Sequence, residues 1–320
     1  MVSVIICTYN RAESLMRTIG SLLKQRGVED DGLWELLVVD NNSQDRTREV
    51  VESCAATAQV KIRHIFEPQQ GKTYALNTGI ANSCGDVTAF TDDDVVVDAG
   101  WLAAVLEATE TYPHRAFGGK VVPLWPTSVP PWIQVTGPYA KPIVGSPVVA
   151  HDSGDEIKEY GEGMWVPIGA NMFFRKEVFE KYGGFRTDLG PKGEIYGPYE
   201  DSEIGFRLKN QGEPILYFPQ AVIYHPVSEH RLSQQYLLRH FWNAGLTQAR
   251  IDDDQLTLVR RAKTILRSVL LVATRLAKYC WTCGRGKPAM NMHHKCLLYY
   301  QTGALYYHAL RTVNAHSPSR

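Results

Sequence analysis

The sequence has little from which a membrane-spanning or disulfide-built protein could be made. No uncharged apolar run among its 320 residues approaches 18 residues, so no spanning helix is expected. Six cysteines in a chain of this length, one of them inside the first apolar run at Cys7, indicate reduced thiols. The first residues, MVSVIICTYNRAESL, lack a basic segment and indicate a first strand, not a signal peptide. These absences predict a protein made and kept in the cytoplasm.

Acidic residues are absent from the end of the chain. No Asp or Glu follows Asp254, whereas eleven Lys and Arg residues do, although the formal net charge of the whole chain is zero. This asymmetry indicates an anionic surface as partner. At ~100° per residue, the bases between Arg260 and Lys278 fall within an arc of about 160°, opposite Leu, Ile, Val and Ala side chains. We therefore expect a cationic amphipathic helix on an anionic membrane surface; a helix that packs its apolar face on the rest of the protein is the alternative.

Two nucleotide-binding signatures are also missing. No G-x-G-x-x-G follows the first apolar run, and no G-x-x-x-x-G-K-[ST] occurs anywhere in the chain. Their absence weakens a dinucleotide-binding domain and a phosphate-loop enzyme as interpretations. The bases of the tail lie on one helix face and are not interleaved with stacking aromatic residues, so no nucleic-acid partner is expected.

Short apolar runs alternate with helix-like patterns over the first ~120 residues. The expected strands are residues 2–7, 34–39, 60–66, 87–90 and 117–122, and the expected helices are residues 11–25, 44–58, 72–83 and 100–111. This alternation indicates βαβ units and hence an α/β fold with a mostly parallel sheet. Further along, the pattern predicts a helix near 201–209, two separate strands near 215–218 and 221–224, and helices from 230 to the end. We expect two domains, residues 1–230 and 231–320.

A proline-rich segment, residues 122–165, interrupts this pattern. Its prolines prohibit long regular elements, and loops of this length in a compact domain are usually functional. Trp125, Trp132 and Trp165 in or beside this segment can stack on sugar rings or belong to the core, and the sequence leaves both interpretations open.

Three consecutive carboxylates follow the fourth expected strand. Asp92, Asp93 and Asp94 come directly after the apolar run that ends at Phe90 and Thr91. Ligands of open α/β sheets bind at the carboxyl ends of strands, and three like charges together are costly without a cation. Mg²⁺ and Mn²⁺ prefer oxygen ligands and bridge a carboxylate to a diphosphate. The segment therefore predicts a metal site; an acidic loop that caps the next helix is the alternative.

Two other strand ends carry polar groups at the same expected edge. The segment Cys7–Arg11 supplies backbone amides, a hydroxyl and an aromatic ring after the first strand, and Asp40 ends the second. A carboxylate at Asp40 can accept the ring N–H of uracil or thymine. A purely structural turn is the alternative.

Five stretches, in order, resemble family-2 glycosyltransferases over about residues 1–230: VSVIICTYNRAESL, LLVVDNNSQDRT, GKTYALNTGI, GDVTAFTDDDV and YEDSEIGFRLKNQG. The resemblance implies the GT-A fold, a Rossmann-like catalytic domain with a mostly parallel central sheet, followed by a helical C-terminal extension. It also implies an inverting, metal-dependent glycosyltransferase that uses a nucleotide-diphosphate sugar. UDP-sugar is the expected donor and dTDP-sugar stays open; the acceptor is expected to be lipid-linked, for example to a polyprenyl carrier, or a polysaccharide.

The same resemblance implies roles for the donor-side residues. Thr8, Tyr9, Asn10 and Asp40 should line the pocket for base and ribose, with Lys72 nearby. Asp92 and Asp94 correspond to the outer carboxylates of the DxD motif, in which Asp94 ligates Mn²⁺ or Mg²⁺ and Asp92 contacts the ribose or the metal. Asp93 has a supporting role in the same site.

His225 and the pair Glu200–Asp201 complete the expected site. The resemblance places His225, after a late strand, against the metal or the diphosphate; a polar surface histidine is the alternative. It matches Asp201 to the catalytic base, and inverting transfer does need a carboxylate that takes the acceptor proton. Glu200 beside it would oppose full ionisation of both groups. The alternative for Asp201 is an acid at a helix N-terminus, which the helix dipole favours.

Two other functions remain as alternatives from the sequence. A metal-dependent nucleotidyltransferase would want a Gly- and Arg-rich phosphate loop, which CTYNRAES lacks. A non-catalytic nucleotide- or carbohydrate-binding scaffold would not need intact carboxylates at Asp92, Asp94 and Asp201. With the basic tail, the favoured interpretation is a cytoplasmic enzyme peripheral on the inner face of the cell membrane. A zinc site from Cys280 and Cys283 is disfavoured, because no second C-x-x-C follows.

Overall fold

A computed structural model of the chain describes residues 1–28, 32–133, 148–161, 164–191, 199–253 and 258–314. The chain divides into two compact units. Unit 1 comprises Met1–Leu124, Val149–Ile195 and Glu200–Pro226, and unit 2 comprises Trp125–Val148, Tyr196–Tyr199 and Val227–Arg320. The domain boundary expected at residue 230 stays a prediction. Part of the proline-rich segment expected to be functional, residues 134–147 and 162–163, lies outside the described residues.

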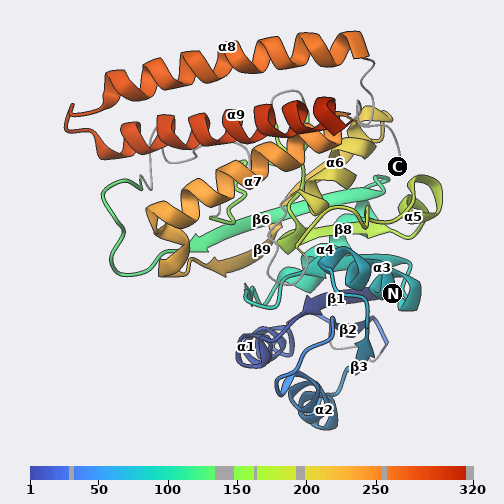
Figure 1. The fold of residues 1–320 in the computed structure, drawn as a ribbon. Coiled ribbons are helices and arrows are strands. Elements are labelled where there is room, and N and C mark those ends of the chain that lie inside the picture. The colour runs from blue at the N-terminus through green and yellow to red at the C-terminus, as the bar shows by residue number, and fades with distance from the viewer. Residues whose placement is uncertain (29–31, 134–147, 162–163, 192–198, 254–257, 315–320) are drawn as a thin grey trace. The chain divides into compact units, whose positions relative to one another are not determined.

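Unit 1 is built on one mixed sheet (Figure 1). Its strands are β1 (Val2–Thr8), β2 (Trp34–Asp40), β3 (Lys61–Phe66), β4 (Val87–Thr91), β5 (Val96–Val97), β6 (Ala116–Leu124), β7 (Lys158–Glu159), β8 (Met172–Arg175) and β9 (Ile215–Pro226). Its helices are α1 (Ala12–Leu22), α2 (Thr47–Thr57), α3 (Lys72–Asn82), α4 (Trp101–Thr111), α5 (Glu177–Tyr182) and α6 (Glu200–Asn210), with a short 3-10 helix η1 (Gly169–Asn171).

The strand order is β3-β2-β1-β4-β8-β6-β9-β5, and β7 pairs with β9. Strands β3, β2, β1 and β4 are parallel neighbours, as expected for βαβ units. Strand β8 is antiparallel to both β4 and β6, so β6 runs in the same direction as β4. Because β9 is parallel to β6, the carboxyl ends of β1, β2, β4 and β9 all lie at one edge of the sheet.

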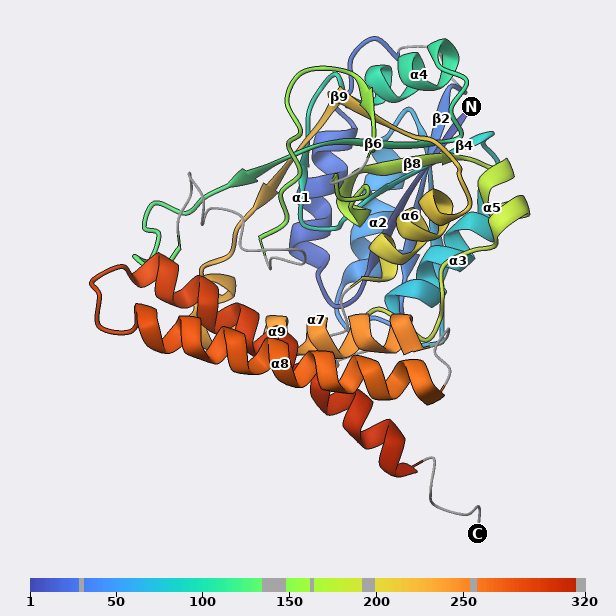
Figure 2. The same cartoon turned by 90° about the horizontal axis from the view of Figure 1, so that it is seen from above.

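Two apolar layers cover the faces of this sheet. Alternate residues of β1 and β2 point to opposite faces, and nearly all are fully buried. One layer packs side chains of α1, α2 and α4 on Val4, Ile6 and Leu36. The other packs side chains of α3, α5 and α6 on Ile5 and Leu37. Figure 2 shows these three helices near one another. The doubly covered sheet explains why these strands read as nearly continuous apolar runs.

Strand β9 differs from the sequence expectation of two separate strands. It runs without a break from Ile215 to Pro226, but its register against β6 shifts between Gly119 and Lys120. Phe218 pairs with Gly119 and Val222 with Lys120, so three residues of β9 are left without paired partners at that point. The shift takes up Pro219, which has no N–H to donate to the ladder. The expected break was therefore a bulge, and the strand continues to His225.

Unit 2 is helical. It contains η2 (Glu229–Leu232), α7 (Gln234–Asp253), α8 (Leu258–Thr282) and α9 (Pro288–Asn314). A small apolar cluster joins α7 and α9 and includes Phe241, Met292 and Trp132, whose indole N–H donates to the Leu232 carbonyl. Helix α8 packs along α9 (Figure 1). Among the described residues, no helix is both long and apolar enough to cross a membrane. The predicted fold class, an α/β domain with a helical C-terminal region, is confirmed.

Candidate active site

The predicted donor-side residues gather at one edge of the sheet because of the strand directions. Thr8, Asp40 and Asp92 end or directly follow β1, β2 and β4, and His225 lies next to the end of β9. The turn after β4 is fixed to α1, since the Thr18 hydroxyl donates to the Val95 carbonyl (2.9 Å) and accepts its N–H. Residues from distant parts of the sequence are thereby brought to one place.

Asp92, Asp94 and His225 form a group that could hold a metal ion. One ligand atom from each residue lies within 4.8 Å of the other two. Among the described residues, these three form the one group of at least three His, Cys, Asp or Glu side chains close enough to share a metal ion. His225 Nε2 lies 3.3 Å from Asp94 Oδ1 and 3.9 Å from Asp92 Oδ2. The side chain of His225 is only 2% exposed, so the alternative of a surface histidine is wrong.

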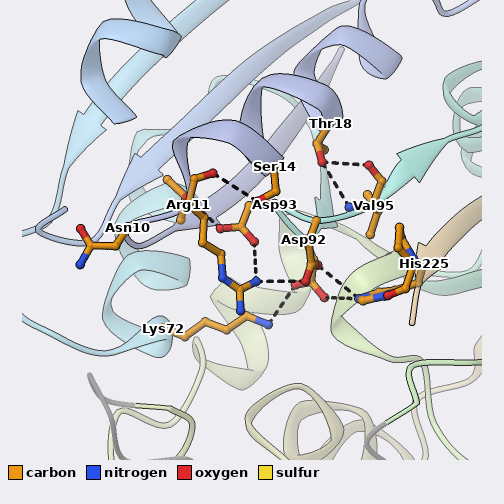
Figure 3. A network of polar contacts seen from close by, with 12 residues as sticks. Asn10, Arg11, Ser14, Thr18, Lys72, Asp92, Asp93, Val95 and His225 are labelled. Atoms are coloured by element: carbon orange, nitrogen blue, oxygen red, sulfur yellow. Dashed lines mark hydrogen bonds and ion pairs between the residues drawn. The ribbon is translucent and has the colours of Figure 1, made fainter. Parts of the chain in front are cut away.

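Each of the two aspartates divides its oxygens between a cation and His225. Figure 3 shows Asp92 between Lys72 and His225. Asp92 accepts from Lys72 Nζ at Oδ1 (3.0 Å) and turns Oδ2 toward His225. Asp94 accepts from Arg11 Nη1 at Oδ2 (3.0 Å) and turns Oδ1 toward His225. Lys72 and Arg11 thus fix the orientation of both carboxylates, and one oxygen of each points to the same place as the imidazole Nε2.

The imidazole of His225 has the tautomer that a metal ligand requires. Its Nδ1 lies 3.1 Å from the Pro226 carbonyl oxygen, so Nδ1–H donates there and Nε2 carries the lone pair when the ring is neutral. Burial alone would lower the pKa of His225, but the hydrogen bond to Asp94 and the charges of Asp94 and Asp92 outweigh it, and the pKa is raised. The raised pKa reflects the negative charge of Asp94 and Asp92 around His225, which would also favour a bound metal cation.

Asp93 lies deeper than its two neighbours. It accepts from the Thr8 hydroxyl (2.8 Å) and from Arg11 Nη1 (3.0 Å), and it is 5% exposed. Burial is the largest influence on its pKa and, with the nearby carboxylates, raises it to about 6 despite the Arg11 charge. These bonds tie the turn after β4 to β1, and this placement is consistent with a supporting role.

The donor set fits a divalent cation. Two carboxylates and one imidazole suit Mn²⁺ well, since Mn²⁺ accepts both ligand types, and carboxylates alone would favour Mg²⁺. Asp92, Asp94 and His225 would hold the ion, with the Pro226 carbonyl, Lys72 and Arg11 as the groups that orient them.

Glu200 and Asp201 begin helix α6, within reach of the same lysine. Lys72 Nζ lies 3.3 Å from Glu200 Oε1 while it also donates to Asp92. Asp201 accepts from the backbone N–H groups of Gly169 and, at 2.7 Å, Ser202. A Cβ on Gly169 would lie 2.9 Å from Asp201 Oδ2, so the absence of a side chain there leaves room for the carboxylate.

The pKa of the Glu200 carboxyl is strongly raised. Glu200 is 7% exposed, and burial raises its pKa to about 7, opposed by the charge of Lys72 and assisted by that of Asp201. The sequence predicted that the two adjacent acids would not both ionise fully, and the raised pKa of Glu200 agrees with it. Asp201 is held in place by two backbone N–H donors.

The predicted base pocket lies between the ends of β1 and β2. Asp40 accepts from the Ser43 N–H at Oδ1 (2.9 Å), and its Oδ2 lies 3.2 Å from His64 Nε2. Asn10 adopts a φ of 52° and joins the two loops, because its N–H donates to the Ser43 hydroxyl and its side chain accepts from the Gln44 N–H. These contacts give Asp40 and Asn10 structural roles beside any role in binding.

The other two pocket candidates differ in exposure. Tyr9 is 37% exposed, whereas Thr8 is buried and its hydroxyl is used on Asp93. Lys72, expected near the base and ribose, is instead bonded to Asp92 and Glu200. The five candidates lie at one edge of the sheet, and a shared pocket for base and ribose stays a prediction.

Sequence reasoning gave four contributors no individual role. Arg11 was seen only as part of a motif, although it is the cation on Asp93 and Asp94. His64 was not singled out, nor was Asn41, whose side chain accepts from the Gly71 N–H (2.7 Å) and positions the start of α3. Asn171, fully buried, donates to the carbonyls of Lys120 and Ala221 and so ties η1 to β6 and β9. One sequence signal could have identified Arg11. It is a basic residue in the loop after the first strand, and the acidic run at residues 92–94 follows another strand that ends at the same edge.

Comparison with known proteins identifies the family. The profile described as Glycosyl transferase family 2 matches residues 3–183. The chain is 29% identical over 246 residues to the glucosyl-dolichyl phosphate glucuronosyltransferase of Haloferax volcanii, which covers 75% of this chain and 74% of that protein. It is 27% identical over 261 residues to the succinoglycan biosynthesis protein ExoM of Rhizobium meliloti, with 81% and 78% covered.

Solved structures share the fold. A mannosyltransferase from Pyrobaculum calidifontis, solved in complex with GDP-Man and Mn²⁺, superposes with a TM-score of 0.56 at 19% identity over all of this chain and 76% of that one. The TarS structure from S. aureus, residues 1–349, gives a TM-score of 0.54 at 15% identity, with 100% and 93% covered. The family match favours a glycosyltransferase over the nucleotidyltransferase and scaffold alternatives. The chain belongs to glycosyl transferase family 2, and it is a glycosyltransferase of the GT-A fold.

Proposed function

We propose that this enzyme transfers a hexose from a nucleoside-diphosphate sugar, with inversion, and that Asp92, Asp94 and His225 hold the Mn²⁺ or Mg²⁺ on which transfer depends. The single observation that carries the proposal is the convergence of one oxygen from each aspartate on the imidazole Nε2 of His225, with Lys72 linking this group to Glu200. A bound divalent cation would neutralise charge on the diphosphate leaving group.

In this proposal the chain's own residues divide the remaining work. Asp201 takes the proton of the acceptor hydroxyl. As it does so, the hydroxyl oxygen of the acceptor forms a bond to the anomeric carbon, and the bond from that carbon to the diphosphate breaks. The carboxylate of Asp201 is oriented by the N–H groups of Gly169 and Ser202. Glu200, buried and bonded to Lys72, positions the start of α6 and supplies the second carboxyl of the pair.

For the donor we propose UDP-sugar, with dTDP-sugar as the second candidate. The support is Asp40, whose buried carboxylate ends β2 and can accept one further hydrogen bond from a pyrimidine ring N–H beside those from Ser43 and His64. Thr8, Tyr9 and Asn10 form the remainder of the proposed pocket. Guanine also offers a ring N–H, so GDP is a necessary comparison in any test.

For the acceptor we propose a lipid-linked glycan or a polysaccharide intermediate, met at the inner face of the cell membrane. The support is the name of the Haloferax relative, a dolichyl phosphate enzyme, and that of the Rhizobium relative, a polysaccharide biosynthesis protein. The basic tail, which has no acidic residue after Asp254, supports a peripheral position at an anionic membrane.

A thermal-unfolding screen of UDP, dTDP and GDP, with and without Mn²⁺, tests the donor site. A ligand at 100 times its Kd should stabilise the protein by about 2.7 kcal/mol. We expect stabilisation by UDP that requires Mn²⁺ and is lost in Asp94→Asn, while Asp201→Asn keeps it but loses sugar transfer. Asp155→Asn, an exposed aspartate on Lys120, serves as a control that changes neither. Metal-independent stabilisation, or its survival in Asp94→Asn, would contradict the assigned metal site.

A further inference from the structure

Helix α8 turns its apolar side away from the helix on which it packs. Leu266 and Leu270 are 63% and 61% exposed, whereas Ser268, on the opposite side, is 7% exposed. The exposed apolar side chains are Leu266, Val269, Leu270, Ala273, Leu276 and Ala277, here named the α8 apolar stripe. At ~100° per residue they fall within an arc of about 120°. The stripe is contiguous, and it lies on one side of a 25-residue helix.

The contact between α8 and α9 includes polar groups. Asn291 of α9 donates to the hydroxyl of Thr282, which is 1% exposed. Arg275 is half-buried and close enough to His293 and His294 of α9 to depress their pKa values, after burial as the larger cause. The buried side of α8 therefore carries hydroxyl groups and an arginine beside the half-buried Ile265, Leu271 and Val272, while Leu266, Leu270 and Leu276 are exposed. A soluble helix normally buries its leucines and exposes such groups, so this arrangement points to an apolar partner.

Basic residues border the α8 apolar stripe. Lys263, Arg267 and Lys278 are exposed and lie along one edge of it. At the end of the helix Trp281 is 58% exposed, and the Arg285 guanidinium lies 4.0 Å from the centre of its ring. No acidic residue occurs between position 255 and the C-terminus. An apolar face with a cationic edge and an amphipathic aromatic side chain complements an anionic bilayer interface.

We propose that the α8 apolar stripe inserts into the interface of an anionic lipid bilayer, with α8 parallel to the membrane plane. Lys263, Arg267 and Lys278 then lie at the level of the lipid headgroups, and Trp281 lies at the boundary between headgroups and acyl chains. A second copy of this chain is a poor occupant, because the cationic edges of the two stripes would repel. The inference rests on the proposed membrane position and deepens it by naming the face of α8 that meets the bilayer, and it depends on no catalytic residue.

Sedimentation of the full chain with sucrose-loaded vesicles tests this proposal. Vesicles of phosphatidylglycerol and phosphatidylcholine should bind the protein, and binding should weaken with salt, while vesicles of phosphatidylcholine alone should bind it much less. Leu266→Gln with Leu270→Gln should lower partitioning by a factor of about a hundred. The matched control is Met16→Gln with Leu23→Gln, two exposed apolar residues of unit 1, which should leave binding unchanged.

A charge variant keeps the test independent of folding effects. Lys263→Gln, Arg267→Gln and Lys278→Gln together should lower binding to anionic vesicles by about a hundredfold, because each base contributes a factor of about five. Unchanged binding in either set, or equal binding to neutral vesicles, would overturn the proposal. The proposal would also be overturned if light scattering showed a dimer that the two leucine substitutions dissociate. Vesicle binding needs no donor, so failure here is distinct from failure of sugar transfer, which is measured on a water-soluble acceptor.

Discussion

Lys72 Nζ lies 3.3 Å from Glu200 Oε1 while it donates to Asp92 Oδ1 at 3.0 Å. The Lys72 ammonium group therefore connects two parts of the site. Glu200 stands beside the proposed base Asp201, and Asp92 belongs to the group that would hold the metal. The pKa of Lys72 is raised well above its usual value: burial opposes the charge, but Asp92, Glu200 and Asp201 outweigh it. The lysine stays charged at every pH at which the enzyme would work, and both sites depend on it.

Removing that charge should destabilise the metal-free protein. In Lys72→Met, Asp92 and Glu200 lose a shared partner, and breaking a buried pair costs about 3 kcal/mol in the free energy of unfolding. Divalent metal should restore part of the loss, because the carboxylates that lost the lysine repel each other and gain most from a new cation. Urea denaturation with EDTA and with Mn²⁺ measures both effects.

Lys120→Met is the matched control for this change. Lys120 pairs with Asp155, whose side chain is 96% exposed, and with Asp152, which is half exposed. Its loss should cost less than about 1 kcal/mol, and Mn²⁺ should not reduce that cost. Equal effects of the two substitutions in EDTA would contradict the role given to Lys72.

His225→Gln should weaken the metal site without unfolding the protein. The amide keeps much of the volume but replaces the imidazole Nε2 that lies 3.3 Å from Asp94. We expect the affinity for Mn²⁺ to fall at least about tenfold, as measured by calorimetric titration. His114→Gln, at a histidine that pairs with Glu159, should bind Mn²⁺ as the unchanged protein does. An unaltered Mn²⁺ affinity in His225→Gln would exclude the histidine from the ligand set.

Gly169→Ala should separate transfer from donor binding. The added Cβ would lie 2.9 Å from Asp201 Oδ2, so the carboxylate or the η1 backbone must move. We expect kcat to fall at least about tenfold, since small displacements of a catalytic group are costly, while stabilisation by UDP with Mn²⁺ is retained. Gly161→Ala, where a Cβ would meet nothing within 4 Å, should change neither quantity. If both variants lose activity equally, the proposed position of Asp201 is wrong.

The sequence predicted the sheet edge well because its signals are local. A strand that is buried on both faces reads as an apolar run, and the residue that follows it must lie at the edge where parallel strands end. This logic placed Asp40 and Asp92 correctly, and it placed His225 correctly although β9 was expected as two strands. The bulge at Pro219 was invisible in the pattern, because a proline inside a strand reads as a break.

Other features depend on contacts that periodicity cannot reveal. The pattern identified Arg11 as part of a motif, but its two carboxylate partners are more than 80 residues away. The amphipathic pattern of α8 defined an apolar face, yet not which face would meet α9. The structure buries Ser268 and Thr282 and leaves Leu266 and Leu270 exposed. Side-chain pairing and helix orientation are tertiary properties, so the sequence left them open.

The free energy of unfolding should fall as the pH rises from 5 to 8 in the absence of metal. Glu200 has a pKa of about 7 in the folded protein, above its usual value of 4.5, so the folded state binds the proton more tightly. Its contribution to stability is therefore complete below pH 4.5 and is lost as the pH rises through 7, a change of about 3 kcal/mol. Urea denaturation of Glu200→Gln at the same pH values should show a flatter profile. A parallel decline in both proteins would show that Glu200 is not its source.

The crossing of α7 and α9 should tolerate no added methyl group. A Cβ on Gly245 would lie 2.0 Å from the Tyr300 carbonyl oxygen, and one on Gly303 would lie 2.3 Å from that of Trp242, so the two backbones approach at reciprocal glycines. Gly245→Ala forces these helices apart and should cost about 1–3 kcal/mol, measured by denaturation followed by circular dichroism. Gly20→Ala is the matched control: in α1 its Cβ would meet nothing within 4 Å, and better helix propensity should raise stability by about 0.5–1 kcal/mol. Opposite signs for two identical substitutions would place the cost in the helix crossing itself, whereas two stabilising changes would show that α7 and α9 are not so closely packed.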